Sequence, residues 1–322
     1  MSRMTLLLSR SDLERLLDVR SCIEGLRQGF TALPPGIDAQ RVRTDLPGPG
    51  TATALIPGLV DGIPAYTVKV NAKFPSSRPA LRGVVCLHDL RSGDLLAVLD
   101  SATVTAWRTG LAAALGTDIL ARAPEHARTV AVIGAGVQSS LVLAGLAVLR
   151  CWDRLVVCDL DATRAHAFAE ARANEDHRPA AVTTDARTAA RQADIVVLAT
   201  WSRSPLLDQG DVRPGAHVTS LGADEPGKAE LSPALLKSGR LIVDDTRLAL
   251  TSGALGTAGL TAADAAGTLG DILRGTIPGR TTDTETTIYT PVGLPWQDLA
   301  LAWTAYRLAR ESGTGHHFDF LT

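Results

Sequence analysis

The stretch that decides the fold is TVAVIGAGVQSSLVLAGLAVL, residues 129–149. Strand-forming residues precede Gly134 and Gly136, and helix-forming residues follow them. The run carries no charge and is long enough to resemble a membrane span, but the two glycines and Gln138 interrupt its middle. A buried strand, a tight turn and a buried helix explain these residues better, and we expect no membrane partner.

Short apolar runs continue after this stretch, at 154–159, 180–184, 194–200, 217–221 and 240–245. Continuous hydrophobicity is typical of strands that are covered on both faces, and the amphipathic segments between the runs predict crossover helices. The pattern predicts an α/β fold, a Rossmann-type doubly wound parallel sheet of about six strands. The segment 249–270, rich in Ala, Gly and Thr, shows no clear period and predicts a flexible loop.

The first 115 residues follow a different pattern. Ser11, with Glu14 three residues later, predicts a capped helix that runs to about Leu17. A second helix is expected near 21–32, followed by short strands, of which the last two are joined by a turn at 91–93. A long alanine-rich helix is predicted near 103–121, and an amphipathic final helix at about 296–311.

Composition excludes several classes of function. The 322 residues carry a formal net charge of −2, so the chain offers no basic field for nucleic acid. Its four cysteines form no pair with the spacing of zinc ligands, so we expect neither a disulfide scaffold nor a metal site. No signal-peptide core begins the sequence, and a cytoplasmic location is expected.

The glycine turn predicts a dinucleotide site. Gly134 and Gly136 would let a pyrophosphate approach the backbone at a helix N-terminus, although position 139 is Ser where the full fingerprint has a third glycine. Asp159, at the end of the next strand, can accept hydrogen bonds from ribose hydroxyls and repels a 2′-phosphate. This favours NAD(H) over NADP(H); the alternative role for Asp159 is a helix cap.

Basic residues in the first part of the chain suggest an anionic ligand. They are Arg41, Arg43, Lys69, Lys73 and Arg108. Arg108 lies in an apolar helix with no acid nearby, and its planar guanidinium suits a small carboxylic acid. A structural ion pair is the alternative for any one of them.

Asp224 follows the apolar run 217–221, whose end is expected at the carboxyl edge of the sheet. Ligands of open α/β sheets bind at that edge, so Asp224 is a candidate proton acceptor beside a nicotinamide. Alternatively, residues 224–227 form only a turn.

Taken together, these motifs resemble the ornithine cyclodeaminase/mu-crystallin family nearly end to end. The matching stretches are QRVRT (40–44), VKVNAKFP (68–75), TAWRTGLAAAL (105–115), VIGAGVQS (132–139), GADEPGKAEL (222–231) and VGLPWQDLA (292–300). The resemblance implies an NAD-binding Rossmann domain at 116–291. It would be inserted into a split α+β domain, 1–115 plus 292–322, that binds substrate and forms a homodimer.

The resemblance also implies roles for individual residues. Arg43, Lys69 and Arg108 match positions that hold the substrate carboxylate, with Arg41 as a substitute for Arg43 if the register differs by two. Asp224 and Lys69 are the implied catalytic residues, and the backbone of Val292 would meet the substrate. The implied cofactor-binding positions are Gly134, Gly136, Val137, Gln138, Asp159, Thr200, Ser220, Leu221 and Lys228.

Three departures from the family pattern suggest a substrate other than ornithine. Ala54 stands where ornithine-cyclising members have a glutamate, Pro291 replaces a serine, and Gly83 replaces a frequent threonine. A buried ammonium without a partner is costly, although His88 or Glu225 could supply the missing charge.

Three functions therefore stay open. The first is an NAD-dependent dehydrogenase or imine reductase that acts at the Cα–N bond of a small amino or imino acid. The second is a cyclodeaminase that releases ammonia and recycles NAD. The third is a ligand-binding protein similar to mu-crystallin.

Overall fold

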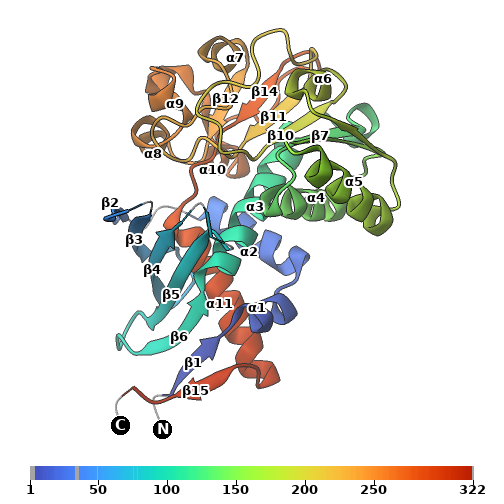
Figure 1. Ribbon diagram of the computed structural model, residues 1–322. Coiled ribbons are helices and arrows are strands. Elements are labelled where there is room, and N and C mark those ends of the chain that lie inside the picture. The colour runs from blue at the N-terminus through green and yellow to red at the C-terminus, as the bar shows by residue number, and fades with distance from the viewer. Residues whose placement is uncertain (1–3, 33–35, 49, 75, 78, 321–322) are drawn as a thin grey trace. The chain divides into compact units, whose positions relative to one another are not determined.

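The computed structural model describes residues 4–32, 36–48, 50–74, 76–77 and 79–320. The chain divides into two compact units. Unit 1 comprises Met1–Thr109 and Leu294–Thr322, and unit 2 comprises Gly110–Gly293. Each unit contains its own β-sheet with helices packed against it (Figure 1).

The sheet of unit 2 is parallel throughout, as the continuous apolar runs predict. Within the described residues it has eight strands in the order β13-β12-β14-β11-β10-β7-β8-β9. Their bounds are β7 (Thr129–Ile133), β8 (Arg154–Cys158), β9 (Ala180–Thr183), β10 (Ile195–Leu198), β11 (His217–Ser220), β12 (Arg240–Val243), β13 (Gly267–Thr268) and β14 (Thr287–Tyr289). The six predicted runs correspond to β7–β12, which confirms the doubly wound parallel sheet.

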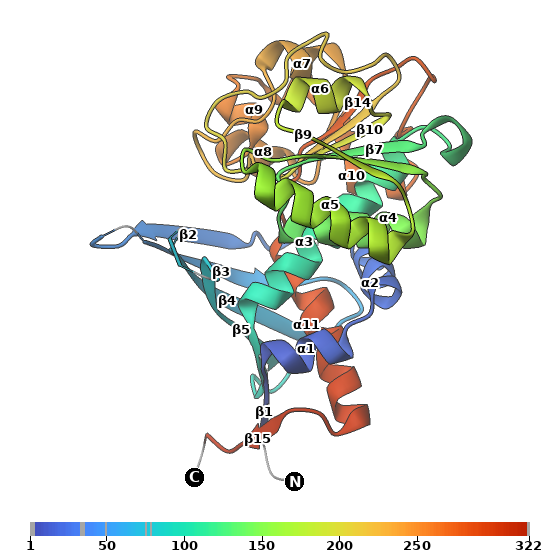
Figure 2. The same cartoon turned by 45° about the vertical axis from the view of Figure 1, so that its right-hand side comes forward.

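Helices cover both faces of this sheet, and successive residues of each strand serve one face and then the other. On β7, Val130 and Val132 pack with α4 (Val137–Leu149) and α5 (Ala162–Asp176), whereas Ala131 and Ile133 pack with α6 (Ala186–Arg191) and α7 (Pro233–Ser238). Figure 2 shows these two helix pairs on opposite faces. The strand order reverses between β7 and β10, and dinucleotides bind beyond the carboxyl ends of strands at such a point.

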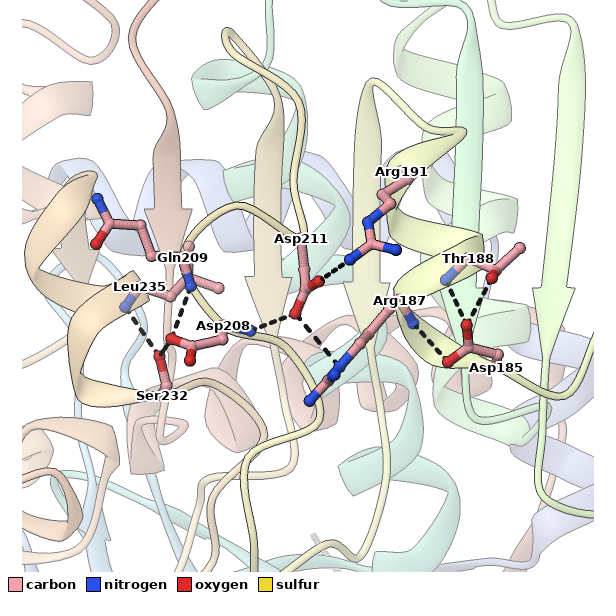
Figure 3. Close-up of polar contacts among 9 residues, drawn as sticks. All are labelled: Asp185, Arg187, Thr188, Arg191, Asp208, Gln209, Asp211, Ser232 and Leu235. Atoms are coloured by element: carbon pink, nitrogen blue, oxygen red, sulfur yellow. Dashed lines mark hydrogen bonds and ion pairs between the residues drawn. The ribbon is translucent and has the colours of Figure 1, made fainter.

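Polar contacts fix the segment before β11 and the starts of α6 and α7 (Figure 3). The buried Asp211 carboxylate accepts a hydrogen bond from the backbone N–H of Asp208 at 2.9 Å. It also forms ion pairs with Arg191 at 2.6 Å and Arg187 at 3.5 Å, both on α6. These contacts join α6 to the segment that leads into β11.

The prediction of a flexible loop at 249–270 is wrong. The region holds α8 (Thr246–Thr251), α9 (Ala254–Thr257), a 3₁₀ turn at Ala262–Asp264, β13 and the start of α10 (Leu269–Leu273). Leu255 and Leu260 are buried in the core. Elements of two to six residues are too short to establish a hydrophobic period, so the pattern did not reveal them. The same reason explains why the central strand β14 was not predicted.

Unit 1 is built on a mixed sheet in the order β15-β1-β6-β5-β4-β3-β2. Its strands are β1 (Thr5–Leu8), β2 (Gln40–Asp45), β3 (Thr51–Gly58), β4 (Ala65–Lys73), β5 (Leu81–Asp89), β6 (Leu95–Asp100) and β15 (His316–Phe318). Of these, β1 and β6 pair in parallel and the other neighbours are antiparallel. The turn between β5 and β6 confirms the prediction at 91–93.

The helix α11 (Pro295–Ser312) packs against β3, β4 and β5 and against α2 (Val19–Thr31). It ends at Gly313, which takes the left-handed conformation with φ of 68°. The first helix, α1, spans Arg10–Leu16, and its capping residue is Ser9 rather than Ser11. Ser9 pairs reciprocally with Asp12, so the predicted capping box exists two residues earlier. The remaining helices are α3 (Ser101–Leu120) and a 3₁₀ turn at Pro124–His126.

Candidate functional site

The glycine turn of unit 2 leaves room for a ligand at the start of α4. Gly134 has φ of +100°, and a Cβ there would lie 2.5 Å from the Ala199 carbonyl oxygen. A Cβ on Gly136 would meet no atom within 4 Å, and no side chain caps α4 in the described structure. The backbone is thus held tightly on one side and open on the other, which suits a pyrophosphate at a helix N-terminus.

Ser139 replaces the third glycine of the fingerprint without disturbing the turn. Its buried hydroxyl donates a hydrogen bond to the Gly134 carbonyl at 2.6 Å. Val137 is exposed at the helix start, and Gln138 has a buried Oε1 without a hydrogen-bond partner among the described residues. Both follow the turn directly, where the resemblance puts the pyrophosphate.

Asp159 is bound to the same turn and does not cap α5. One carboxylate oxygen accepts from the Ala135 N–H at 2.8 Å and the other from the Asp161 N–H at 2.9 Å. Asp161 is the residue that caps α5. Asp159 therefore lies beside the glycine turn at the end of β8, and the alternative as a helix cap is wrong. Its predicted contact with an adenosine ribose stays a prediction.

The loop after β11 brings together two of the predicted residues. Lys228 Nζ donates to Asp224 Oδ1 at 2.7 Å and lies 4.0 Å from Glu225 Oε2. It also lies 5.0 Å from the centre of the Trp201 ring. Lys228 is buried, whereas the Asp224 side chain is about a third exposed. The turn lies at 225–228, one residue later than predicted, and it brings the accessible carboxylate of Asp224 beside a cation.

Two predicted cofactor positions, Thr200 and Ser220, bind a buried carboxylate that sequence reasoning missed. Glu230 accepts hydrogen bonds from Thr200, from Ser220 and from the Gly222 N–H. Leu221, between these positions, is packed in the core. The sequence contains a signal, an acid between apolar residues in KAEL, but its partners are distant along the chain.

A second buried carboxylate fixes the backbone of Val292. Asp244, directly after β12, accepts from the Val292 N–H at 3.0 Å and from the Gly293 N–H at 2.6 Å. Burial raises the pKa of Asp244, and these backbone hydrogen bonds oppose the rise. The Val292 N–H is thus already engaged, so any contact of this backbone with a substrate would use its carbonyl.

In unit 1, Lys69 and Arg108 converge on Asp298 of α11. Lys69 Nζ lies 2.6 Å from Asp298 Oδ2, and Arg108 Nε lies 3.3 Å from Asp298 Oδ1. Lys69 is 2% exposed and Asp298 1% exposed. Arg108 therefore has an acidic partner, which the sequence did not reveal because Asp298 is far away along the chain.

This buried cluster carries one positive charge in excess. Burial lowers the pKa of Lys69 to about 8, Asp298 opposes this shift, and Arg108 and Arg41 add to it. Two cations against one carboxylate leave a charge that an anionic ligand would neutralise. The contacts of Lys69 and Arg108 with Asp298 fit the alternative of a structural ion pair. The excess positive charge of the cluster also fits the binding of a substrate carboxylate.

Strand register separates the two candidate arginines of β2. Arg41 pairs with Leu55, which pairs with Lys69, so Arg41 and Lys69 point to the same face of the sheet. Arg43 points to that face too, but its side chain is exposed and lies 3.3 Å from Asp45. Arg41 is half-buried and close enough to affect the pKa of Lys69, so the structure brings Arg41 nearer to the cluster.

The same register shows where the departures from the family pattern lie. Ala54 and His88 belong to the opposite face, where His88 stacks on Tyr66 with ring centres 5.0 Å apart. The identity of neither residue therefore indicates which charges lie beside Lys69. Gly83 has φ of +153°, and a Cβ there would collide with the Val70 carbonyl oxygen, so its backbone accounts for the glycine.

Two kinds of feature are absent from the residues that the structure describes. No helix among them combines the length and the apolar content that crossing a membrane requires. No group of three or more His, Cys, Asp or Glu side chains in that part of the chain is arranged to hold a metal ion.

Comparison with known proteins agrees with these observations. The chain is 32% identical over 279 residues to a Delta(1)-pyrroline-2-carboxylate reductase of Bacillus cereus, covering 83% of this chain and 85% of that protein. The structure of the Thermococcus litoralis Delta(1)-pyrroline-2-carboxylate reductase with NADH and L-proline matches with a TM-score of 0.90 and 28% identity, over 97% and 99% of the two chains.

An archaeal alanine dehydrogenase dimer with bound NAD also matches with a TM-score of 0.90, at 26% identity over 99% of this chain and 100% of that one. The model of the ornithine cyclodeaminase/mu-crystallin family matches residues 3–313. The chain therefore belongs to the ornithine cyclodeaminase/mu-crystallin family.

Proposed function

We propose that this protein is an NAD(H)-dependent oxidoreductase that reduces a small cyclic imino acid at its C=N bond, or oxidises the matching amino acid in reverse. The observation that carries the proposal is the excess positive charge of the Lys69–Asp298–Arg108 cluster, which suits the carboxylate that every such substrate contains. The reductases among the relatives favour Δ1-pyrroline-2-carboxylate, with L-proline as its product.

The residues of unit 2 fit NAD(H). The turn at Gly134–Gly136 and the first N–H groups of α4 would hold the pyrophosphate, and Asp159 would hold the adenosine ribose. When bound, the nicotinamide donates or accepts the hydride. Thr200, Ser220, Leu221 and Lys228 would line the remainder of this site.

Asp224 would move the proton that accompanies the hydride. In the reductive direction the imine nitrogen becomes an amine and gains one proton, which a carboxyl group at that nitrogen can supply and then recover from solvent. Lys228, 2.7 Å from Asp224, would steady its carboxylate form between turnovers. Lys69 and Arg108 would hold the substrate carboxylate and so fix the position of the reacting carbon.

The test measures nicotinamide absorbance and ammonia in the same reaction. We expect NADH consumption with Δ1-pyrroline-2-carboxylate, and slow NADH formation without ammonia from L-proline. Ammonia from ornithine without net NADH would instead establish a cyclodeaminase, and binding without turnover a mu-crystallin-like protein. Asp224→Asn should lower kcat by about 10²- to 10⁴-fold. Asp61→Asn, in an exposed turn, is the matched control and should leave kcat unchanged.

We also propose that the protein is a homodimer formed through the sheet of unit 1. The face opposite Lys69 exposes an apolar row in register across three strands, with Val42 57%, Val70 49% and Val84 39% exposed. Ala54 of β3 lies in the same row, between Val42 and Val70. A contiguous apolar patch of this kind marks an interaction surface. Light scattering should give twice the chain mass, and Val70→Asp should shift the protein to monomer; a monomeric wild type would refute the proposal.

A further inference from the structure

Glu230 joins three segments of unit 2 through a single carboxylate. Its Oε1 accepts from the Thr200 N–H at 2.6 Å and from the Thr200 hydroxyl at 2.7 Å. Its Oε2 accepts from the Ser220 hydroxyl at 2.7 Å and from the Gly222 N–H at 2.8 Å. The side chain is 1% exposed, and a Cβ on Gly222 would collide with it, so the contact requires a glycine there.

The charge of this carboxylate has no counter-ion nearby. All four hydrogen bonds come from neutral donors, and no lysine or arginine among the described residues lies within 4.0 Å of Glu230. Each oxygen receives one backbone N–H, which can only donate, so the donor set matches an ionised carboxylate. The pKa of Glu230 is raised above its ordinary value, because burial outweighs the hydrogen bonds from Thr200, Ser220 and Gly222 that lower it.

The position of Glu230 beside the carboxyl ends of β10 and β11 relates it to one end of a dinucleotide. Asp159 after β8 marks the adenosine half, and the turn at Gly134–Gly136 after β7 marks the pyrophosphate. A dinucleotide crosses the crevice where the strand order reverses, so its nicotinamide half belongs above β10 and β11. Thr200 follows β10 and Ser220 ends β11, and Glu230 holds both.

We infer that Glu230 is a positioning residue that also tunes the cofactor preference of the site toward the oxidised form, by placing an uncompensated negative charge behind the segments that face the nicotinamide. The inference rests on the proposed binding of NAD(H). The oxidised ring carries a positive charge and the reduced ring does not, so the carboxylate attracts only the former. The same charge favours reduction of an imine, because loss of the hydride to the imine carbon leaves the ring positive.

The decisive variant is Glu230→Gln, which removes the charge and keeps the size. In either orientation its amide nitrogen faces a backbone N–H, of Thr200 or of Gly222, so some loss of cofactor affinity is expected from geometry alone. An electrostatic role of Glu230 predicts, in addition, that the affinity for NAD⁺ falls more than the affinity for NADH. Calorimetric titration should show the Kd for NAD⁺ rising about tenfold more than the Kd for NADH, as expected for one charge removed at a distance of about 10 Å.

The ratio of the two affinities separates the possible outcomes. An equal loss for NAD⁺ and NADH would overturn the inference and leave Glu230 with a purely structural role. Failure of the wild type to bind either form would instead refute the proposed function. The matched control is Glu170→Gln, an exposed residue of α5, which should change neither Kd.

A measurement on the wild type keeps the inference testable if Glu230→Gln does not fold. The uncompensated charge predicts that the wild type binds NAD⁺ at least as tightly as NADH. A wild type that binds NADH tenfold more tightly than NAD⁺ would contradict the inference. Glu230→Asp, which retains the charge, should weaken both forms alike and preserve the ratio.

Discussion

Unit 1 and unit 2 each bury a carboxylate, but they stabilise it in opposite ways. Asp298 of unit 1 is contacted by two cations, Lys69 and Arg108. Glu230 of unit 2 is contacted only by neutral donors. Desolvation costs several kcal/mol per ion in both cases, and it is offset by charge in the first and by dipoles in the second. The first cluster keeps an excess positive charge and the second an excess negative one.

The difference matters because the two excess charges suit different ligand groups. A positive cluster attracts a carboxylate, whereas a negative one attracts an oxidised nicotinamide ring. A buried charge that a counter-ion neutralises inside the protein offers little attraction to a charged ligand. Here each cluster keeps a net charge. The comparison can be tested by substituting one charged residue of a cluster at a time.

The largest expected effect follows removal of the anion of unit 1. Asp298→Ala leaves Lys69 and Arg108 buried without their partner, so the free energy of unfolding should fall by about 3–5 kcal/mol, as urea denaturation would measure. Glu311→Ala is the matched control on the same helix, since Glu311 is exposed and lies 3.9 Å from Arg307. The control should cost less than about 1 kcal/mol. Equal losses would show that the cluster contributes no more than a surface pair.

The pH dependence of the free energy of unfolding tests the role of Lys69, a cation of the unit 1 cluster. The pKa of Lys69 is about 8 in the folded protein against 10.5 for an ordinary lysine. Between these values the unfolded chain binds more protons, so the free energy of unfolding should rise with pH. Relative to Lys69→Met, which does not titrate, the gain should reach about 3 kcal/mol by pH 10.5. If the difference in free energy of unfolding between the wild type and Lys69→Met did not change with pH, the pKa of Lys69 in the folded protein would be that of an ordinary lysine.

Affinity for a carboxylate should change in the opposite direction over the same interval. As Lys69 loses its proton above pH 8, the excess positive charge of the cluster disappears. Binding of tetrahydrofuran-2-carboxylate, which has no titrating amine, should weaken by up to about tenfold per pH unit when followed by calorimetry with NADH present. Constant affinity from pH 7 to 10 would exclude Lys69 from the carboxylate site.

The smallest expected effect concerns the other carboxylate that neutral donors stabilise. Asp244→Asn replaces one accepting oxygen with a donor, so the N–H group of either Gly293 or Asp245 loses its acceptor, whereas Val292, which contacts both oxygens, keeps one. The free energy of unfolding should fall by about 1–3 kcal/mol, less than for Asp298→Ala. Asp283→Asn, at an exposed position, is the control. A loss as large as that of Asp298→Ala would mean that neutral donors stabilise a buried charge as strongly as cations do.

Much of the site was predictable because it depends on local pattern. The glycine turn, the strand before it and Asp159 lie within one βαβ unit, so their spacing along the chain fixes their spacing in space. The six predicted strands follow from continuous apolar runs for the same reason. Asp224 and Lys228 also lie within one turn, although their ion pair required the structure to reveal it.

The sequence by itself determined the parallel sheet, the glycine turn after β7 and the presence of unusual cations in the first part of the chain. Only the tertiary structure decided what those cations contact and which carboxylates are buried. Asp298 meets Lys69 and Arg108 across two helices and a strand, and Glu230 collects donors from the ends of two strands. Such contacts depend on packing between distant segments, and hydrophobic period and local propensity carry no information about them.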